Sequence, residues 1–391
     1  MKSYRFILAL CLFYALNVFS NENDSTRKSK CDFYSKNYLN IGSTHAPVIF
    51  FSRLLFGGEI NEKNKGNLKP VNRYRRTGGE AQYLFGLSIK LNKKKIDSYY
   101  VEFQQLATFG GKYHQELYNL ILDGNSNLDQ VTLSKNEFHF RNYQLLHGGV
   151  EINSMRFGLV LGNILTENTL DFKDDNYIRF DEDYLWEVSL SSNVTSLGNT
   201  NNFFEKNGQL LGLDWEIKEK VNDKWNWGVG VQNLGLLIYN NNTNFYKIDS
   251  TFIYEGLSYQ EIINFNTTAD EFSSNLINEQ TPKNYFSMTP FSTYGHINYS
   301  HNNTSYSADI FYRHNSQFFP RLNLTATKIL SEKFMIGSNL TYGGYTTLQI
   351  GSYMQYSLKN FNVNLHLMNL MGLIPSWGKS FGLGIQMNLA L

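Results

Sequence analysis

One short segment of the sequence has residues that could bind phosphate. The segment GLIPSWGKS, residues 372–380, carries a glycine and then a Gly-Lys-Ser sequence, as do loops that cradle nucleotide phosphates. Those loops place about four residues between the first glycine and the Gly-Lys pair. Here Gly372 and Gly378 enclose five, and residues 380–391 alternate like a strand where a helix would be needed. We therefore interpret the segment as an extracellular loop.

No other cluster of reactive side chains has the spacing of a known catalytic or metal site. The segment DFKDDNYIRFDED, residues 171–183, holds six carboxylates, which hard cations such as Ca²⁺ prefer. It lacks the glycine and spacing of a calcium-binding loop, so we interpret it as a solvated loop. The eight histidines form no H-E-x-x-H motif, and the G-x-S-x-G letters at residues 378–382 lead into a predicted strand, not into the helix that follows a serine nucleophile. We expect no catalytic residue, no metal, no cofactor and no enzymatic activity.

Alternation of apolar and polar residues is the dominant pattern from residue 83 onward. In SFGLGIQMNLAL, residues 380–391, the odd positions are apolar and the even ones small or polar, which predicts a strand with one apolar face. Similar runs predict about 14 strands. We expect them near residues 83–91, 97–105, 143–152, 154–162, 184–192, 208–219, 225–238, 291–300, 304–313, 318–330, 333–343, 346–358, 361–371 and 380–391. Residues 131–140 alternate too and would add one strand.

Two architectures accommodate such strands, a soluble sandwich and a membrane barrel. Most predicted strands are longer than the roughly 5 or 6 residues usual in soluble proteins. Their polar faces carry charges, and aromatic residues gather near strand ends, as at a membrane interface: Trp225, Trp227, Tyr342, Tyr345, Tyr356 and Phe361. We therefore expect an all-β, transmembrane antiparallel β-barrel. The predicted lipid-facing residues are Val363, Leu365, Leu367, Phe381, Leu383, Ile385, Met387 and Leu389. The predicted lumen-facing residues are Glu102, Asp214, Glu216, Asp309, Arg321, Gln386 and Asn388.

Residues 1–20 have the composition of a secretory signal peptide. A basic start precedes an apolar run at residues 6–19, which is too short to span a membrane comfortably. We predict cleavage near Ser20 and export to the cell outer membrane.

The remaining chain divides into two predicted parts. We expect residues 21–82 to form an N-terminal extension or lumen plug, within which the apolar residues 46–58 would plug or pack. Residues 83–391 are expected to form the barrel, closed where the last strand pairs with the first, near Tyr83–Leu91. Helical spacing predicts helices at residues 113–122, 256–265 and 269–278.

Five segments together carry a resemblance to a known protein family. They are HQELYNLILDGNSNL, FRNYQLLHGGVE, VNDKWNWGVGVQNLGLLIYNNNTNFYKIDSTFIYEGLSYQEI, YSADIFYRHNSQFFPRLNLTATKILSEKFMIGSNLTYGGY and GLGIQMNLAL. In this order they resemble an outer-membrane barrel family of unassigned function from Bacteroidota, related in architecture to PorV-like and fatty-acid-transporter-like barrels. The resemblance covers most of residues 83–391 and implies a barrel of about 14 strands. It implies no catalytic residues, because none is assigned in that family.

Two functions follow from these expectations. Our leading hypothesis is a non-enzymatic accessory or scaffold subunit of an outer-membrane complex, of the type IX secretion or barrel-assembly kind. Residues 105–142 and 239–290 would then serve as docking surfaces. The alternative is a passive outer-membrane transporter for hydrophobic or small polar molecules. We expect outer-membrane lipid and other outer-membrane or periplasmic proteins as partners, and a net charge of +1 gives no reason to expect nucleic acid.

Overall fold

The computed structural model describes most of the chain. The described residues are 31–61, 73–91, 96–125, 128–181, 185–197, 207–240, 243–254, 279–280 and 286–391. The predicted signal peptide and the predicted helices at residues 256–265 and 269–278 lie outside them. Within the described residues, no helix is both long enough and apolar enough to cross a membrane.

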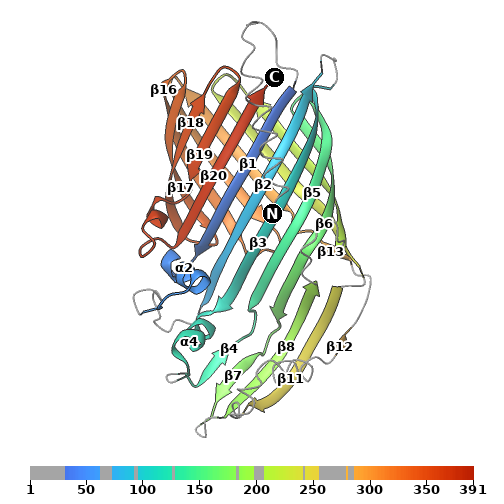
Figure 1. Ribbon diagram of the computed structural model, residues 1–391, viewed down its shortest axis with the longest axis vertical. Coiled ribbons are helices and arrows are strands. Elements are labelled where there is room, and N and C mark those ends of the chain that lie inside the picture. Colours follow the sequence, from blue (N-terminus) through green and yellow to red (C-terminus); the bar gives the residue numbers. More distant parts are fainter. Residues whose placement is uncertain are drawn as a thin grey trace.

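Fourteen antiparallel strands form a closed barrel (Figure 1). Around the wall the pairing order is β1, β2, β3, β5, β6, β9, β10, β14, β15, β16, β17, β18, β19 and β20, and β20 pairs again with β1. The bounds are β1 Cys31–Ser43, β2 Tyr74–Lys90, β3 Ser98–His114, β5 Glu137–Ile152, β6 Met155–Phe172, β9 Gly208–Lys220, β10 Trp225–Tyr239, β14 Ser292–His301, β15 Thr304–Arg313, β16 Phe319–Ser331, β17 Phe334–Gly344, β18 Leu348–Ser357, β19 Phe361–Leu367 and β20 Ser380–Ala390. The predicted barrel of about 14 strands is confirmed, but the strand predicted near residues 184–192 is not part of this ring.

The strand that pairs with the last strand and closes the barrel is β1, and not the strand near Tyr83–Leu91 as predicted. β20 pairs with β1 over almost its whole length, from Asp32 opposite Ala390 to Gly42 opposite Ser380. The predicted closure against Tyr83–Leu91 is therefore wrong. The predicted extension or plug at residues 21–82 is also wrong where it covers β1 and the first half of β2, since both are wall strands.

The reason for this error lies in the outward-facing residues of β1. Phe33 and Leu39 are exposed on the outer face, as expected of a membrane strand. Ser35 and Asn37 occupy the same phase between them, so the apolar alternation is interrupted. Because the alternation is interrupted at its centre, the sequence pattern did not predict a strand here.

The two ends of the barrel carry connections of different length. One end, here called the short-turn rim, has turns at residues 153–154, 221–224, 302–303, 332–333 and 358–360, and Cys31 and Leu391 also lie there (Figure 1). The other end, the long-loop rim, carries α2 (Val48–Phe56), α4 (Gln115–Asp123), the 3₁₀ helix η1 (Leu370–Leu373) and the longer connections. α4 confirms the helix predicted at residues 113–122. This asymmetry is typical of outer-membrane barrels.

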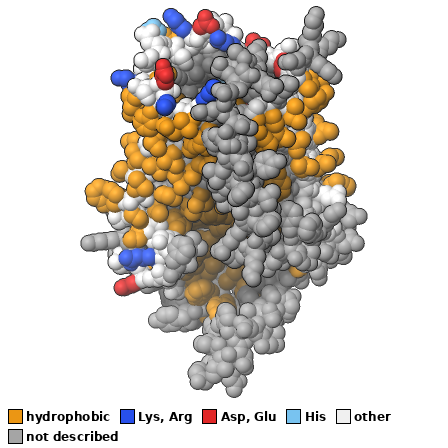
Figure 2. Space-filling model, turned by 45° about the horizontal axis from the view of Figure 1, so that its top comes forward, with side chains coloured by type: hydrophobic (Ala, Val, Ile, Leu, Met, Phe, Trp, Pro, Cys, Tyr) orange, Lys and Arg blue, Asp and Glu red, His pale blue; other side chains and the backbone are white. Residues whose placement is uncertain are grey.

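The outer wall is covered by apolar side chains. Figure 2 shows them as a band around the described part of the barrel, with charged side chains above it at the short-turn rim. Many of these large apolar side chains are more than a third exposed, among them Phe85, Val101, Leu159, Leu213, Val229, Ile310, Leu324, Leu340 and Ile350. A soluble protein rarely exposes an apolar surface of this extent. The band is therefore the surface that meets lipid in a transmembrane barrel.

Part of the sheet extends past the long-loop rim and is here called the protruding sheet (Figure 1). In this protruding sheet β4 (Gln130–Thr132), β7 (Tyr177–Phe180), β8 (Trp186–Leu197) and β11 (Thr243–Tyr254) pair in that order, with β12 (Glu279–Gln280) on β11. β13 (Phe286–Met288) pairs with β10 instead. β6 pairs with β8 as well as with β9, so the sheet continues the wall. Residues 171–183, predicted as a solvated loop, instead include the end of β6 and all of β7.

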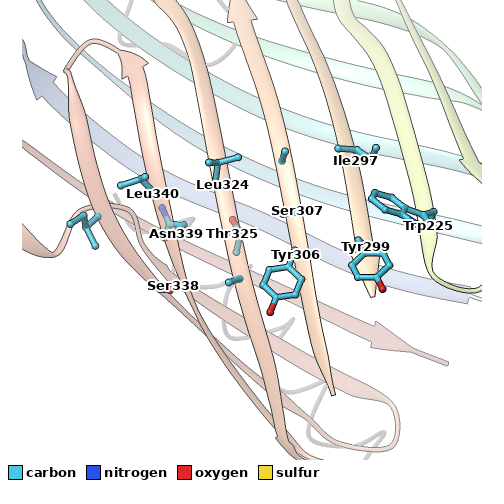
Figure 3. A pocket seen from close by; sticks show the side chains of 13 residues that line it. Trp225, Ile297, Tyr299, Tyr306, Ser307, Leu324, Thr325, Ser338, Asn339 and Leu340 are labelled. Carbon is cyan, nitrogen blue, oxygen red and sulfur yellow. The ribbon is translucent and has the colours of Figure 1, made fainter. Parts of the chain in front are cut away.

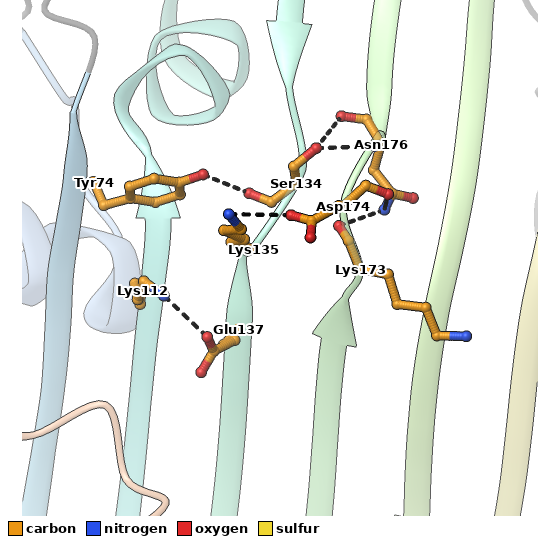
Figure 4. A network of polar contacts seen from close by, with 8 residues as sticks. All are labelled: Tyr74, Lys112, Ser134, Lys135, Glu137, Lys173, Asp174 and Asn176. Atoms are coloured by element: carbon orange, nitrogen blue, oxygen red, sulfur yellow. Dashed lines mark hydrogen bonds and ion pairs between the residues drawn. The ribbon is translucent and has the colours of Figure 1, made fainter.

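Polar contacts fix the joint between the wall and the protruding sheet (Figure 4). The Tyr74 hydroxyl donates to the Ser134 carbonyl oxygen at 2.9 Å, and the Asn176 amide donates to the Ser134 hydroxyl at 2.9 Å. The Lys135 ammonium lies 3.2 Å from an Asp174 carboxylate oxygen. These contacts join the links β4–β5 and β6–β7, so the sheet projects in a defined direction.

A small core lies where α2 and α4 meet at the long-loop rim. It is formed by Ala46, Phe50 and Tyr118. The His45 ring lies 4.3 Å from the Tyr118 ring and nearly perpendicular to it, and only 2% of His45 is exposed. Burial, and then the nearby positive charge of Arg75, lowers the pKa of His45 to about 3. Its imidazole is therefore neutral at physiological pH.

Candidate functional site in the barrel lumen

Glu102 on β3, predicted to face the lumen, lies in a cluster of polar contacts near the short-turn rim. Its carboxylate accepts a hydrogen bond of 2.6 Å from the Tyr34 hydroxyl and lies 2.8 Å from the Arg156 guanidinium. That guanidinium lies 3.6 Å from the centre of the Tyr100 ring. Glu102 is 5% exposed, so its negative charge is compensated inside the wall by direct contacts.

Asp214 on β9, also predicted to face the lumen, links a histidine to a bulge. One carboxylate oxygen lies 2.6 Å from His147 Nδ1, and the other accepts a hydrogen bond of 2.8 Å from the Asn233 amide. Asn233 has φ +60° and lies where the β9–β10 register shifts. His147 Nε2 lies 3.0 Å from Gln104 Oε1, so both ring nitrogens are engaged and neither is free to act as a general base. The arrangement holds the wall together.

The other predicted lumen residues have weaker or more exposed contacts. Glu216 is 2.7 Å from the ammonium of Lys218, and Asp309 accepts a hydrogen bond of 3.2 Å from an asparagine of β16. Gln386 is half-buried and Asn388 is exposed on β20. Their lumen-facing orientation stays a prediction.

The predicted lipid-facing residues lie on the last two strands in matching phase. In the β19–β20 register, Val363 faces Met387, Leu365 faces Ile385, and Leu367 faces Leu383. Met387 is 43% exposed, and the others, Phe381 and Leu389 included, are half-buried. Their contact with lipid also stays a prediction.

An apolar cluster inside the barrel was missed by the sequence analysis. Its members are almost fully buried and belong to the wall and the adjoining β8: Tyr143, Leu145, Val160, Ile164, Leu197, Leu210, Leu237 and Tyr239. The signal was present in LLGL at residues 210–213, where consecutive leucines place one on each face of the strand. The lumen therefore combines polar groups with an apolar wall on its β5–β6–β9–β10 side.

An ion pair spans the lumen near the long-loop rim. Glu80 on β2 lies 2.5 Å from Arg313 at the end of β15, and their side chains are 0% and 3% exposed. β2 and β15 are seven strands apart in either direction around the ring, so they belong to opposite walls. Arg321, predicted to face the lumen, approaches the same carboxylate at 3.8 Å. These side chains therefore cross the lumen and narrow it at this level.

The loop that follows Arg313 adds further contacts across the lumen. Residues 314–318, HNSQF, connect β15 to β16 and are here called the crossing loop. The Tyr345 hydroxyl donates to the Ser316 carbonyl oxygen at 3.0 Å, and the Arg141 guanidinium of the far wall donates to the Asn315 carbonyl oxygen. Gln317 donates to Glu137, also on the far wall. Asn315 and Gln317 have φ values of +52° and +56°, an uncommon conformation for residues other than glycine.

Two glycines on the far wall make room for the crossing loop. A Cβ atom at Gly110 would lie 2.9 Å from the Ser316 carbonyl oxygen, and one at Gly78 would lie 2.4 Å from the Tyr345 ring. Larger residues at either position would displace the crossing loop or its tyrosine. Tyr345 was predicted to belong to an interface girdle, but it is 1% exposed and packs against Phe318 inside the barrel. That prediction is corrected, whereas Trp225, Trp227, Tyr342 and Tyr356 are exposed.

A depression of about 650 Å³ lies on the wall formed by β10 and β14 to β18 (Figure 3). Trp225, Tyr306, Leu324 and Leu340 line it and belong to the exposed apolar residues of the outer band. The depression therefore belongs to the outer surface of the wall. Among the described residues, no three His, Cys, Asp or Glu side chains are grouped to hold a metal ion.

Comparison with known proteins gives a family match and a set of barrel structures. The model of a family of unknown function, DUF5723, matches residues 163–367, more than half of the chain. No curated protein matches the sequence.

Among solved structures, a FadL homologue of Pseudomonas aeruginosa is 8% identical at a TM-score of 0.40, covering 92% of this chain and 89% of its own. The toluene transporter TodX of Pseudomonas putida is 9% identical at 0.37, covering 93% and 89%. The translocator domain of the autotransporter NalP from Neisseria meningitidis is 7% identical at 0.34, covering 99% and 96%. Similarity of this degree carries no argument about function.

Proposed function

The chain belongs to this DUF5723 family of unknown function, and we propose that it is an outer-membrane barrel through which small polar molecules pass when the crossing loop moves aside. One observation carries the proposal. The lumen is lined by paired charges and amides, and near one rim it is crossed by a five-residue loop that noncovalent contacts hold to the far wall. A barrel of about 14 strands is wide enough for a channel unless something fills it.

The long-loop rim is the proposed extracellular end. Outer-membrane barrels have short turns on the periplasmic side and longer loops outside. The short-turn rim, where Cys31 and Leu391 lie, would then face the periplasm. The crossing loop would close the lumen from the outside, where solutes first arrive.

The transport proposal is tested by removing the ion pair that spans the lumen. The double variant Glu80→Ala/Arg313→Ala is preferable to either single variant, because one buried charge left unpaired would destabilise the barrel by about 3–5 kcal/mol. We expect the double variant to conduct in planar bilayers and to admit small sugars into liposomes faster than the unmodified protein. A matched control is Arg179→Ala/Glu187→Ala, which removes a 3.0 Å pair from the protruding sheet.

Folding of each variant is checked by heat-modifiability on gels. If the folded double variant and the unmodified protein both fail to conduct and to admit solutes, the transport proposal is wrong. Equal permeability of the double variant and the control would instead show that the crossing loop does not limit passage.

A second candidate, an accessory or scaffold subunit of a complex such as type IX secretion or barrel assembly, is favoured by the protruding sheet. The sheet extends beyond the rim and carries an aromatic cluster, with Trp186 5.2 Å from Phe180 and 5.8 Å from Tyr254. Such surfaces favour protein contacts. Affinity purification from native outer membranes should recover a partner that is lost in Trp186→Ala but kept in Trp225→Ala. Recovery of the barrel alone would argue against this role.

A further inference from the structure

The segment that resembled a phosphate loop has a different property in the folded chain. Residues 370–377, LMGLIPSW, connect β19 to β20 and are here called the apolar knuckle. Figure 1 places it beside α2 at the lower left of the barrel. Five large apolar side chains point away from the protein there, with exposures from 38% to 70%: Leu370, Met371, Leu373, Ile374 and Trp377.

Several backbone amides of the apolar knuckle are hydrogen-bonded within the connection itself. The amides of Gly372, Ile374 and Trp377 donate to carbonyl oxygens within the same turn at 3.2, 3.1 and 2.9 Å. The Asn369 side chain accepts from the Met371 amide at 3.1 Å and donates to the Ser380 carbonyl oxygen at 3.1 Å. These hydrogen bonds reduce the number of unpaired backbone groups beside the exposed apolar side chains, which favours contact with lipid, where unpaired groups are costly.

The apolar knuckle is held firmly against the barrel. The Val48 amide of α2 donates to the Gly378 carbonyl oxygen at 2.7 Å, and the Ile49 amide donates to the Pro375 carbonyl oxygen at 2.9 Å. No charged residue occurs from residue 368 to residue 378. The short turns at the opposite rim, such as SEK at residues 331–333, are polar and charged. The knuckle is thus a fixed apolar projection.

We propose that the apolar knuckle inserts into the acyl-chain and headgroup boundary of the bilayer that surrounds the barrel. Its position argues for this occupant, because it directly joins β19 and β20 and continues their outer apolar face past the strand ends. Tryptophan is enriched at such boundaries, and Trp377 is the most exposed of the five, at 70%. The proposal rests on the barrel fold and not on the transport function.

Lipids with brominated acyl chains test the proposal by quenching tryptophan fluorescence at contact. The protein is placed in nanodiscs of brominated or unbrominated phosphatidylcholine, and the emission of Trp377→Phe is subtracted from that of the unmodified chain. We expect most of the emission assigned to Trp377 to be lost in brominated lipid and little of it to be quenched by dissolved iodide. The matched control, Trp186→Phe, assigns the emission of a tryptophan in the protruding sheet, which should respond mainly to iodide.

Leu373→Trp in the Trp377→Phe background reports from a second exposed position and remains informative if the first variant folds poorly. Quenching of either knuckle tryptophan by brominated lipid supports insertion. If iodide quenches them as strongly as Trp186 and brominated lipid leaves them unchanged, the knuckle lies in water and the proposal is wrong.

Discussion

Ile385 and Gln386 are adjacent on β20, and their side chains leave opposite faces of the wall. Ile385 is in phase with Leu365, its partner on β19. Arginine at residue 385 should therefore meet lipid and destabilise the barrel by about 2–4 kcal/mol near mid-bilayer. Arginine at residue 386 should be tolerated because the lumen already holds several guanidinium groups. Heat-modifiability gels of the two variants compare them directly, and equal tolerance would reject the assigned orientation.

His45, at the corner of α2 and α4, gives a pH-dependent prediction. Its pKa falls from 6.5 to about 3 on folding. The opened chain therefore binds more protons between these values, so stability of this corner is full above pH 6.5 and declines as the pH falls below it. At pH 5 the loss should be at most about 2 kcal/mol.

The measurement is an NMR titration of the His45 ring, with hydrogen exchange of residues 44–56 corrected for intrinsic rates. His45→Gln should remove the part of the pH dependence that comes from this residue. A ring that titrates near pH 6.5 in the folded protein would contradict the prediction.

At the scale of elements, Asp214 and Asp309, which were both predicted to face the lumen, have different structural roles. Asp214 supports the β10 bulge through the Asn233 amide and also contacts His147, while Asp309 accepts hydrogen bonds from side chains on its own strand and on β16. Asp214→Ala should therefore cost about 1–3 kcal/mol, because it leaves a backbone amide and a histidine without that acceptor. Asp309→Ala should cost clearly less. Urea unfolding in detergent compares them, and a larger loss for Asp309→Ala would contradict the assignment.

Strand alternation made most of the wall predictable, because every lipid-facing strand must be apolar on one face. β1 was not predictable in this way, since Ser35 and Asn37 interrupt its outer face. The crossing loop was not predictable either. Its role depends on Glu80 and Arg313 meeting across the lumen, and they are 233 residues apart in the chain. Alternation within a strand predicts which side chains share a face of that strand. Contacts between opposite walls arise only when the barrel closes, so they cannot be predicted from that alternation.

At the scale of the whole molecule, β1 is needed to close the ring. Without it the edges of β2 and β20 would leave backbone groups unpaired in lipid, each at a cost of several kcal/mol. Scrambling residues 31–43 should therefore abolish the heat-modifiable form. A control that replaces Phe33 and Ile41 with leucine keeps the outer face apolar and should still assemble. Normal assembly of the scrambled chain would mean that β1 is a dispensable extension.

Cys31 and Leu391, the first and last residues of the barrel wall, are paired like other neighbours in the wall. The Cys31 amide donates to the Leu391 carbonyl oxygen at 3.3 Å, and the Leu391 amide donates to the Cys31 carbonyl oxygen at 2.8 Å. The seam thus has the hydrogen bonding of any other junction in the wall. A short linker from Leu391 to Cys31 would make the wall a circular chain. New termini could then be introduced at the turn of residues 302–303, which gives a circular permutant. The barrel fold then depends on the cyclic order in which its strands pair and not on which strand comes first in the chain.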